Sequence, residues 1–193
     1  MRKLVHALVF AALVLPAVAT AQPRNDEEAL AYTRAVQRGH DGAKRADWQT
    51  ASDGYGEAAS IRPRSGEPVL FQAMLLRARG DLPGALGRFR EAARLAEATG
   101  QAEDGARAKA LLGIAMVLEA QRQFADARTA FQAYVSFAES HGSVTTFPAV
   151  GRARVQAIDR VDELDQAYRE VRERIAARER ENARGGRSGG TGN

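Results

Sequence analysis

The sequence contains no cysteine among its 193 residues. This absence excludes disulfide bonds, thiolate metal sites, cysteine nucleophiles and the attachment of lipid to a lipoprotein cysteine. Aromatic residues are also scarce, at 6%, whereas hydrophobic residues make up 45% and charged residues 27%. Alanine, leucine, arginine and glutamate recur throughout, and these residues favour helix. We therefore expect a helix-rich globular chain with little or no β-sheet, built as one domain or as a short array of helical hairpins.

Several signatures of metal and nucleotide chemistry are absent too. After the N-terminal segment the chain has two histidines, His40 and His141, and neither belongs to an HxxxH or HxxE pair that would place two ligands on one helical face. No GxxxxGK(S/T) or GxGxxG sequence occurs. Asp41 follows His40, but adjacent helical side chains point about 100° apart and cannot form an acid–base couple. We expect no enzymatic activity, no cofactor and no bound metal.

Residues 1–21 differ in composition from the rest of the chain. Two basic residues come first, an apolar run follows over residues 4–15, and the segment ends in Ala19-Thr20-Ala21. This order predicts a secretory signal peptide that is cleaved after Ala21. An uncleaved membrane anchor is the alternative, but Pro16 leaves the apolar run too short to cross about 30 Å of hydrocarbon. We expect an exported protein, periplasmic or secreted, with no integral membrane span after cleavage.

The formal net charge of +4 does not indicate nucleic-acid binding. Basic residues are interleaved with acidic ones along most of the chain rather than gathered in one stripe. An exported protein would also seldom meet DNA or RNA. We therefore expect no nucleic-acid partner.

A repeat with helical spacing runs through the middle of the sequence. Each copy holds four residues separated by steps of three, four and three, which places them on one stripe of a helix. The small alanine of each copy lets a neighbouring helix approach, and the aromatic residue after it fills the space beside that contact. The second copy follows the first by 34 residues and the third follows the second by 42. The copies are Trp48, Ala51, Tyr55 and Ala58; Leu82, Ala85, Phe89 and Ala92; and Phe124, Ala127, Phe131 and Tyr134.

This pattern resembles the tetratricopeptide repeat (TPR), a helix-turn-helix unit of 34 residues, over about residues 30 to 140. The resemblance lies in the alanines and aromatic residues of the three copies and in Pro63 after the first. It is weaker in the first helix of each unit, where Gly39, Ala73 and Ala115 take the small position and Gly42 replaces an aromatic residue. The resemblance implies an all-α fold, a right-handed α-solenoid of about three hairpins over residues 22–142. An unrelated helical bundle with coincidental spacing is the alternative.

Capping residues predict where these helices begin and end. A helix from Asn25, with Glu28 at capping-box spacing, runs to about Lys44. The boundaries of the following helices are set by Asp47 and Pro63, by Ser65 and Gly80, by Asp81 and Gly100, and by Phe124 and Gly142. The eight extra residues between the second and third copies imply either a longer fourth helix or a wider loop around residues 99–107.

The C-terminal part is a long charged segment, predicted to be helical over residues 143–182 and followed by a disordered Gly/Arg tail over residues 183–193. Its apolar residues alternate steps of three and four, the 3.5-residue period of a coiled coil. This seam could cover the end of the solenoid or pair with another chain. We favour the cap, because fewer than four heptads make a marginal coiled coil. The seam consists of Val161, Leu164, Tyr168, Val171 and Ile175.

The resemblance also implies a binding site, because the first helix of each hairpin lines the concave groove in that family. The residues that would fall there make a mixed apolar and basic surface: Val36, His40, Lys44, Leu70, Met74, Arg77, Leu112, Met116 and Glu119. The alternative is that Leu70, Met74, Leu112 and Met116 are ordinary core. We expect a non-enzymatic protein–protein interaction scaffold of the cell envelope that binds a peptide or protein partner in this groove. A structural protein that self-associates through its C-terminal helix is the second hypothesis.

Overall fold

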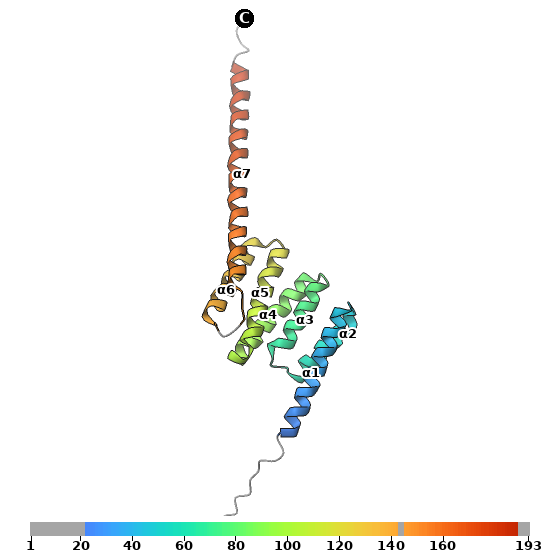
Figure 1. Cartoon of the computed structure of the whole chain (residues 1–193). Helices are drawn as coiled ribbons and strands as arrows, with labels where there is room; N and C mark the ends of the chain where they lie inside the picture. Colours follow the sequence, from blue (N-terminus) through green and yellow to red (C-terminus); the bar gives the residue numbers. More distant parts are fainter. Residues whose placement is uncertain (1–21, 143–144, 189–193) are drawn as a thin grey trace, which may run out of the picture.

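The computed structural model describes residues 22–142 and 145–188 of the chain. The predicted signal peptide, residues 1–21, lies outside this part, as do residues 189–193. The described residues form seven α-helices, one short 3-10 helix and no strand. Three antiparallel helical hairpins stand side by side, and one long helix leaves the last of them as a single rod (Figure 1). The predicted all-α architecture of three hairpins and a long C-terminal helix is confirmed.

The first hairpin joins α1 to α2, the second joins α3 to α4, and the third joins α5 to α6. The bounds are α1 Gln22–Lys44, α2 Trp48–Ile61, α3 Gly66–Ala78, α4 Leu82–Thr99, α5 Asp104–Ala120, α6 Phe124–Ser140 and α7 Pro148–Ser188, with the 3-10 helix η1 at Gln101–Glu103.

Short polar side chains cap the helices where the sequence predicts. Asp47, Ser65 and Asp81 each accept a hydrogen bond from a backbone N–H in the first turn of the helix that follows, at 3.1, 3.3 and 2.9 Å. Gly100 ends α4 with a positive φ of 81°, which glycine adopts without strain. The predicted start of α1 is wrong: the helix begins at Gln22, so Asn25 lies inside it. Proline is well tolerated in the first turn of a helix, so Pro23 accommodates this earlier start.

The eight additional residues between the second and third copies of the repeat lengthen two helices, and the loop between these helices keeps its length. Helix α4 has 18 residues where α2 has 14, and α5 has 17 where α3 has 13. Four residues connect α4 to α5, the same number that connect α2 to α3. Each insertion is about one helical turn, so the apolar stripes keep their faces. The sequence alternative of a longer fourth helix is therefore correct, and a longer fifth helix accompanies it.

The aromatic residues of the repeat lie at the centre of the array. Tyr55, Phe89 and Phe131 are buried, as are the alanines of the three copies. Burying side chains of this size contributes roughly 1.5–3 kcal/mol each. The ring of Phe89 lies directly on Gly113 of the next unit, where any added Cβ would overlap it. The repeat residues therefore determine how neighbouring helices pack: an aromatic side chain on one helix fits against a small residue on the next.

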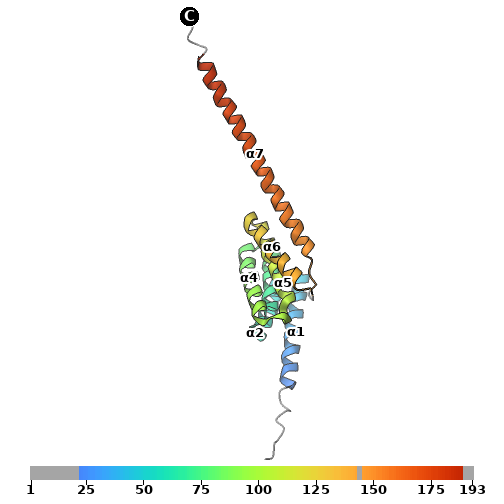
Figure 2. The same cartoon turned by 90° about the vertical axis from the view of Figure 1, so that its left-hand side faces the viewer.

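Helix α7 covers the end of the array with its first turns only. Gly151 and Ile158 are buried against α6, and the Arg128 side chain donates a 2.6 Å hydrogen bond to Asp159. From Arg160 to Asn182 every residue is exposed, and the helix projects away from the hairpins (Figures 1 and 2). The cap that we favoured from the sequence therefore exists, but the predicted seam does not form it. The helix also continues past its predicted end at Asn182 to Ser188, because an existing helix adds residues at little further cost in free energy.

Candidate functional site

The predicted groove residues lie on α1, α3 and α5, the first helices of the three hairpins. Val36, Leu70 and Leu112 stand at equivalent positions of the three units and face the interior. Leu70 is fully buried in the core between the second and third hairpins. Val36 and Leu112 are half-buried and pack against buried clusters. This row therefore supports the array and offers little surface to a ligand; for Leu70 and Leu112 this agrees with the alternative that they belong to the core.

One turn further along, the equivalent residues are His40, Met74 and Met116, and these reach the surface. His40 is half-buried, while Met74 is 45% exposed and Met116 is 39% exposed. The Arg77 guanidinium approaches the Met116 sulfur at 3.4 Å and so bridges α3 and α5. These four residues form one partly apolar face across the first helices, which we call the Met face. An exposed methionine row is an adaptable binding surface because its side chains are flexible and polarizable.

A cavity of about 270 Å³ opens at the Met face between the first two hairpins. Three aromatic rings form its wall. The ring centroid of His40 lies 4.8 Å from that of Phe71 and 5.6 Å from that of Tyr55, and the Tyr55 and Phe71 centroids lie 5.4 Å apart. The cavity is lined by His40, Ala43, Trp48, Tyr55, Phe71, Met74, Leu75 and Ala78.

Sequence reasoning placed His40 and Met74 at this site but missed Phe71 and assigned Trp48 to the repeat. One feature of the sequence could have identified Phe71. The equivalent residue of the third unit, 42 residues later, is Gly113, so the two units differ at this position. At that junction the ring of Phe89 fills the space beside the glycine. At the first junction a second aromatic ring takes the place of the glycine, and the cavity lies beside the two rings.

Charged residues border the Met face. The side chain of Lys44 is 73% exposed, and its ammonium lies 3.5 Å from the Asp41 carboxylate. The hydrogen bond from Gln37, helped by the charge of Lys44, holds the pKa of Asp41 below its usual range. At the other end, Glu119 lies 3.4 Å from Arg154 of α7. Glu119 is therefore paired with the cap and Lys44 with Asp41, whereas Arg77 lies beside Met116 on the Met face.

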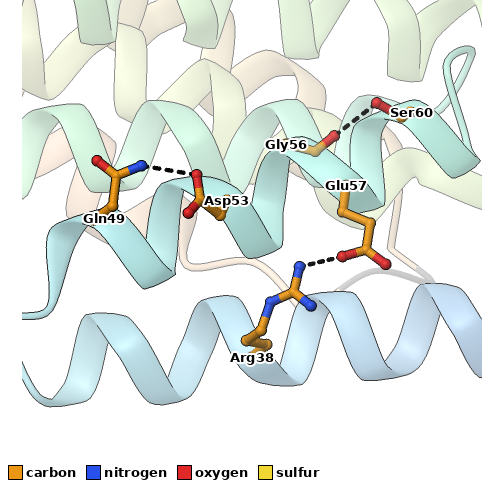
Figure 3. Close-up of polar contacts among 6 residues, drawn as sticks. All are labelled: Arg38, Gln49, Asp53, Gly56, Glu57 and Ser60. Carbon is orange, nitrogen blue, oxygen red and sulfur yellow. Dashed lines mark hydrogen bonds and ion pairs between the residues drawn. The ribbon is translucent and has the colours of Figure 1, made fainter.

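The opposite side of the first hairpin is polar. Arg38 lies about 200° around α1 from His40 and forms an ion pair with Glu57 of α2 (Figure 3). On α2, Gln49 donates a 2.9 Å hydrogen bond to Asp53, and the Ser60 hydroxyl donates one of 3.1 Å to the Gly56 carbonyl. These are exposed contacts of the kind that contribute little to stability. The apolar cavity thus belongs to one side of the hairpin.

Catalytic and metal chemistry finds no support in the described residues. No group of three or more His, Asp or Glu side chains within residues 22–142 and 145–188 could hold a metal ion. One GxSxG sequence begins at Gly186, but its serine, Ser188, is the last residue of helix α7, whereas a nucleophile elbow requires a preceding strand. Over the same part of the chain, no helix combines the length and apolar character needed to cross a membrane.

Solved structures share this arrangement of helices. The TPR2B domain of yeast Sti1, in its pHsp70 complex, is similar with a TM-score of 0.57 at 15% sequence identity; the match covers 68% of this chain and 98% of that domain. The Arabidopsis OM64 TPR domain is similar with a TM-score of 0.53 at 15% identity, over 67% of this chain and 98% of that domain. No protein-family model and no curated protein sequence matches the chain. The likenesses confirm a TPR-like fold.

Proposed function

We propose that this TPR-like chain is a non-enzymatic adaptor of the cell envelope, whose array binds a peptide segment of a partner protein on the Met face. The observation that carries the proposal is the cavity walled by His40, Tyr55 and Phe71, with the partly exposed Met74 at its edge. An apolar cavity beside a few charged groups is the usual form of a site that anchors one side chain of a ligand. The Sti1 domain with the same fold was solved in a complex with pHsp70, which supports a protein or peptide as the type of ligand.

The chemistry of the face indicates what the peptide contains. The cavity wall is aromatic and aliphatic, so it suits a large apolar side chain. Lys44 and Arg77 belong to α1 and α3, two of the helices that line the cavity, where Lys44 is 73% exposed beside Asp41 and Arg77 lies beside Met116. Cations in such positions attract carboxylates. We expect peptides with an aromatic or aliphatic anchor next to acidic residues.

Placement in the envelope rests on the N-terminal segment, whose basic start, apolar run and Ala19-Thr20-Ala21 end have the order of a signal peptide. N-terminal sequencing of the exported protein is expected to begin at Gln22. Retention of residues 1–21 on the mature chain would contradict this part of the proposal and leave peptide binding untouched.

Trp48 makes a direct binding test possible. It is the one tryptophan of the chain and it lines the cavity, so its fluorescence should change when a side chain enters. Peptides selected from a displayed random library are titrated against the purified protein. The variant Met74→Glu/Met116→Glu places two carboxylates on the Met face at exposed positions, which leaves the core intact. We expect it to lose at least tenfold in affinity.

The matched control is Gly87→Glu/Ala133→Glu. It adds the same two charges at exposed positions on α4 and α6, the second helices of their hairpins. This variant should bind as the natural protein does. Equal binding by the Met-face variant and the control, or a Trp48 signal that stays constant while peptide binds, would exclude this face as the site.

Self-assembly through the C-terminal helix is a second candidate function, favoured by the exposed apolar residues of α7. It uses a different surface, so it can coexist with peptide binding or replace it.

A further inference from the structure

The free part of α7, residues 160–182, consists entirely of exposed residues and carries a row of apolar side chains. We call this part the arm. Its five seam residues are between 42% and 65% exposed. Isolated exposed apolar residues are common on proteins, but five in one row at coiled-coil spacing are not. The row is made of Val161, Leu164, Tyr168, Val171 and Ile175.

We propose that the arms of two copies of this chain pair side by side as a short parallel coiled coil, in register. In that arrangement each seam residue faces its own copy, which gives five consecutive apolar layers. Val161, Tyr168 and Ile175 occupy the a positions of the heptads, and Leu164 and Val171 occupy the d positions. The proposal does not rest on peptide binding, because no residue of the Met face belongs to the arm.

Charges beside the seam match this arrangement. In a parallel pair, each g residue meets the e residue five positions later on the other helix. Arg160 then faces Asp165 of the second copy, and Arg174 faces Glu179 of the second copy. Symmetry forms each pair twice, which gives four attractive contacts. The remaining pairing, Ala167 with Arg172 of the second copy, involves only one charge, so it neither attracts nor repels the second helix.

Antiparallel pairings fit less well. The register that keeps opposite charges together places Val161 against Arg178 of the second copy at both ends of the seam, so fewer apolar layers remain. Shifting the register by one heptad restores those layers but brings Arg160 opposite Arg174 and Asp165 opposite its own copy. Like charges in such positions destabilise the pair and select against that register.

The array leaves room for a second arm. The capping face of α7, made by Gly151, Val155 and Ile158, lies roughly a third of a turn around the helix from the seam. A second helix can therefore run along the seam while α6 stays on the capping face. A parallel pair also brings both arrays to the same end, so two Met faces act on one partner or on a repeated one. Linked sites of this kind raise the apparent affinity without any new contact.

Association should be weak and depend on concentration, because the seam spans fewer than three heptads. Sedimentation equilibrium of the purified protein is expected to give the monomer mass at low concentration and twice that mass at high concentration. The variant Leu164→Glu/Val171→Glu should remain a monomer throughout. Its matched control, Gln166→Glu/Ala177→Glu, adds the same charges on the outer side of the arm and should still pair. All four positions are exposed in one chain, so the fold is unaffected, as circular dichroism would verify.

The absence of natural cysteine makes the orientation testable. Val161→Cys should form a disulfide between two copies under mild oxidation, because the same position of both helices meets in a parallel pair at a distance that suits a disulfide. Glu163→Cys, on the outer side, should not. In an antiparallel pair the two sulfurs introduced by Val161→Cys would lie roughly 25 Å apart, as about 17 residues of helix separate the layers. A monomer at every concentration, pairing that Leu164→Glu/Val171→Glu leaves intact, or a pair without the Val161→Cys disulfide would each overturn the proposal.

Discussion

The array and the arm contain the same kind of sequence but meet opposite environments. In both, an aromatic residue stands on an apolar stripe with helical spacing. Phe131 in the array is 0% exposed, whereas Tyr168 in the arm is 65% exposed. The hairpins find a partner helix a few residues away in the chain, because short loops return each helix against the previous one. The arm has no such return within the described residues. The spacing of apolar residues therefore predicts which residues share a face of a helix. The loops between the helices determine whether another helix covers that face.

The point where the two regions meet lies within a single helix. Ile158 is 3% exposed and Ile175, on the same helix, is 54% exposed. Residues around Ile158 close the core of the third hairpin, next to Ala115 and Phe131. Beyond Arg160 the helix relies on its backbone hydrogen bonds and on residues with high helix propensity. The first turns of α7 therefore contribute to the free energy of unfolding of the array, and the arm does not.

The largest expected effect tests the difference between the first turns of α7 and the arm, by making the same isoleucine-to-alanine substitution in each. Ile158→Ala should lower the free energy of unfolding by about 2–4 kcal/mol, because it leaves a cavity over the end of the core. Ile175→Ala should change that free energy by less than about 0.5 kcal/mol. Urea titration followed by Trp48 fluorescence, which reports the array, measures both. Equal effects of the two substitutions would break the comparison between array and arm.

Much of the array could be predicted because its information is local. Asp47, Ser65 and Asp81 begin helices through contacts within one turn, and the Ala–aromatic spacing identifies the faces that are buried. The cap could not be assigned in the same way. Val155 and Ile158 have the same spacing as Val161 and Leu164. Which of them touches α6 depends on where the loop between α6 and α7 brings the helix back, and no residue pattern encodes that point.

The candidate site shows the same limit. Repeat spacing placed His40, Met74 and Met116 at equivalent positions, and all three reach the surface. The cavity beside them depends on a departure from the repeat, since Phe71 stands where the third unit has Gly113. A repeat pattern identifies the surface positions that all units have in common. It does not identify a contact between two units that depends on a residue found in only one of them.

The next effect concerns places where the helices of the array touch closely, a feature that the arm lacks. A Cβ added at Gly39 would overlap the ring of Tyr55, whereas one added at Gly56, on the outer face, meets nothing. Gly39→Ala should lower the free energy of unfolding by about 1–3 kcal/mol, because the added methyl group forces the Tyr55 ring out of its packing against His40 and Phe71. Gly56→Ala should raise it by up to about 1 kcal/mol through helix propensity. The same urea titration distinguishes them by sign, and stabilisation by both substitutions would show that this hairpin is loosely packed.

The smallest expected effect compares a buried tyrosine of the array with the exposed Tyr168. The Tyr32 hydroxyl donates a 2.6 Å hydrogen bond to Glu67 and so joins α1 to α3. Burial, followed by this bond to a carboxylate, raises the pKa of Tyr32 above its usual value of about 10. The neutral phenol is the form that the fold favours. Its contribution to stability is therefore complete below pH of about 10, the unfolded pKa, and declines as the pH rises above it.

Tyr32→Phe should lower the free energy of unfolding by about 1 kcal/mol at neutral pH, since it removes one hydrogen bond and leaves the Glu67 carboxylate, which is half-exposed, to water. The variant should also lose less stability than the natural protein between about pH 9 and pH 11, because the titrating phenol is gone. Tyr168→Phe is the matched substitution in the arm and should leave the neutral-pH value unchanged, as its side chain is exposed. Urea midpoints measured across this pH range decide the matter. An alkaline decline of equal steepness with and without the Tyr32 hydroxyl would mean that this contact does not tie the first hairpin to the second.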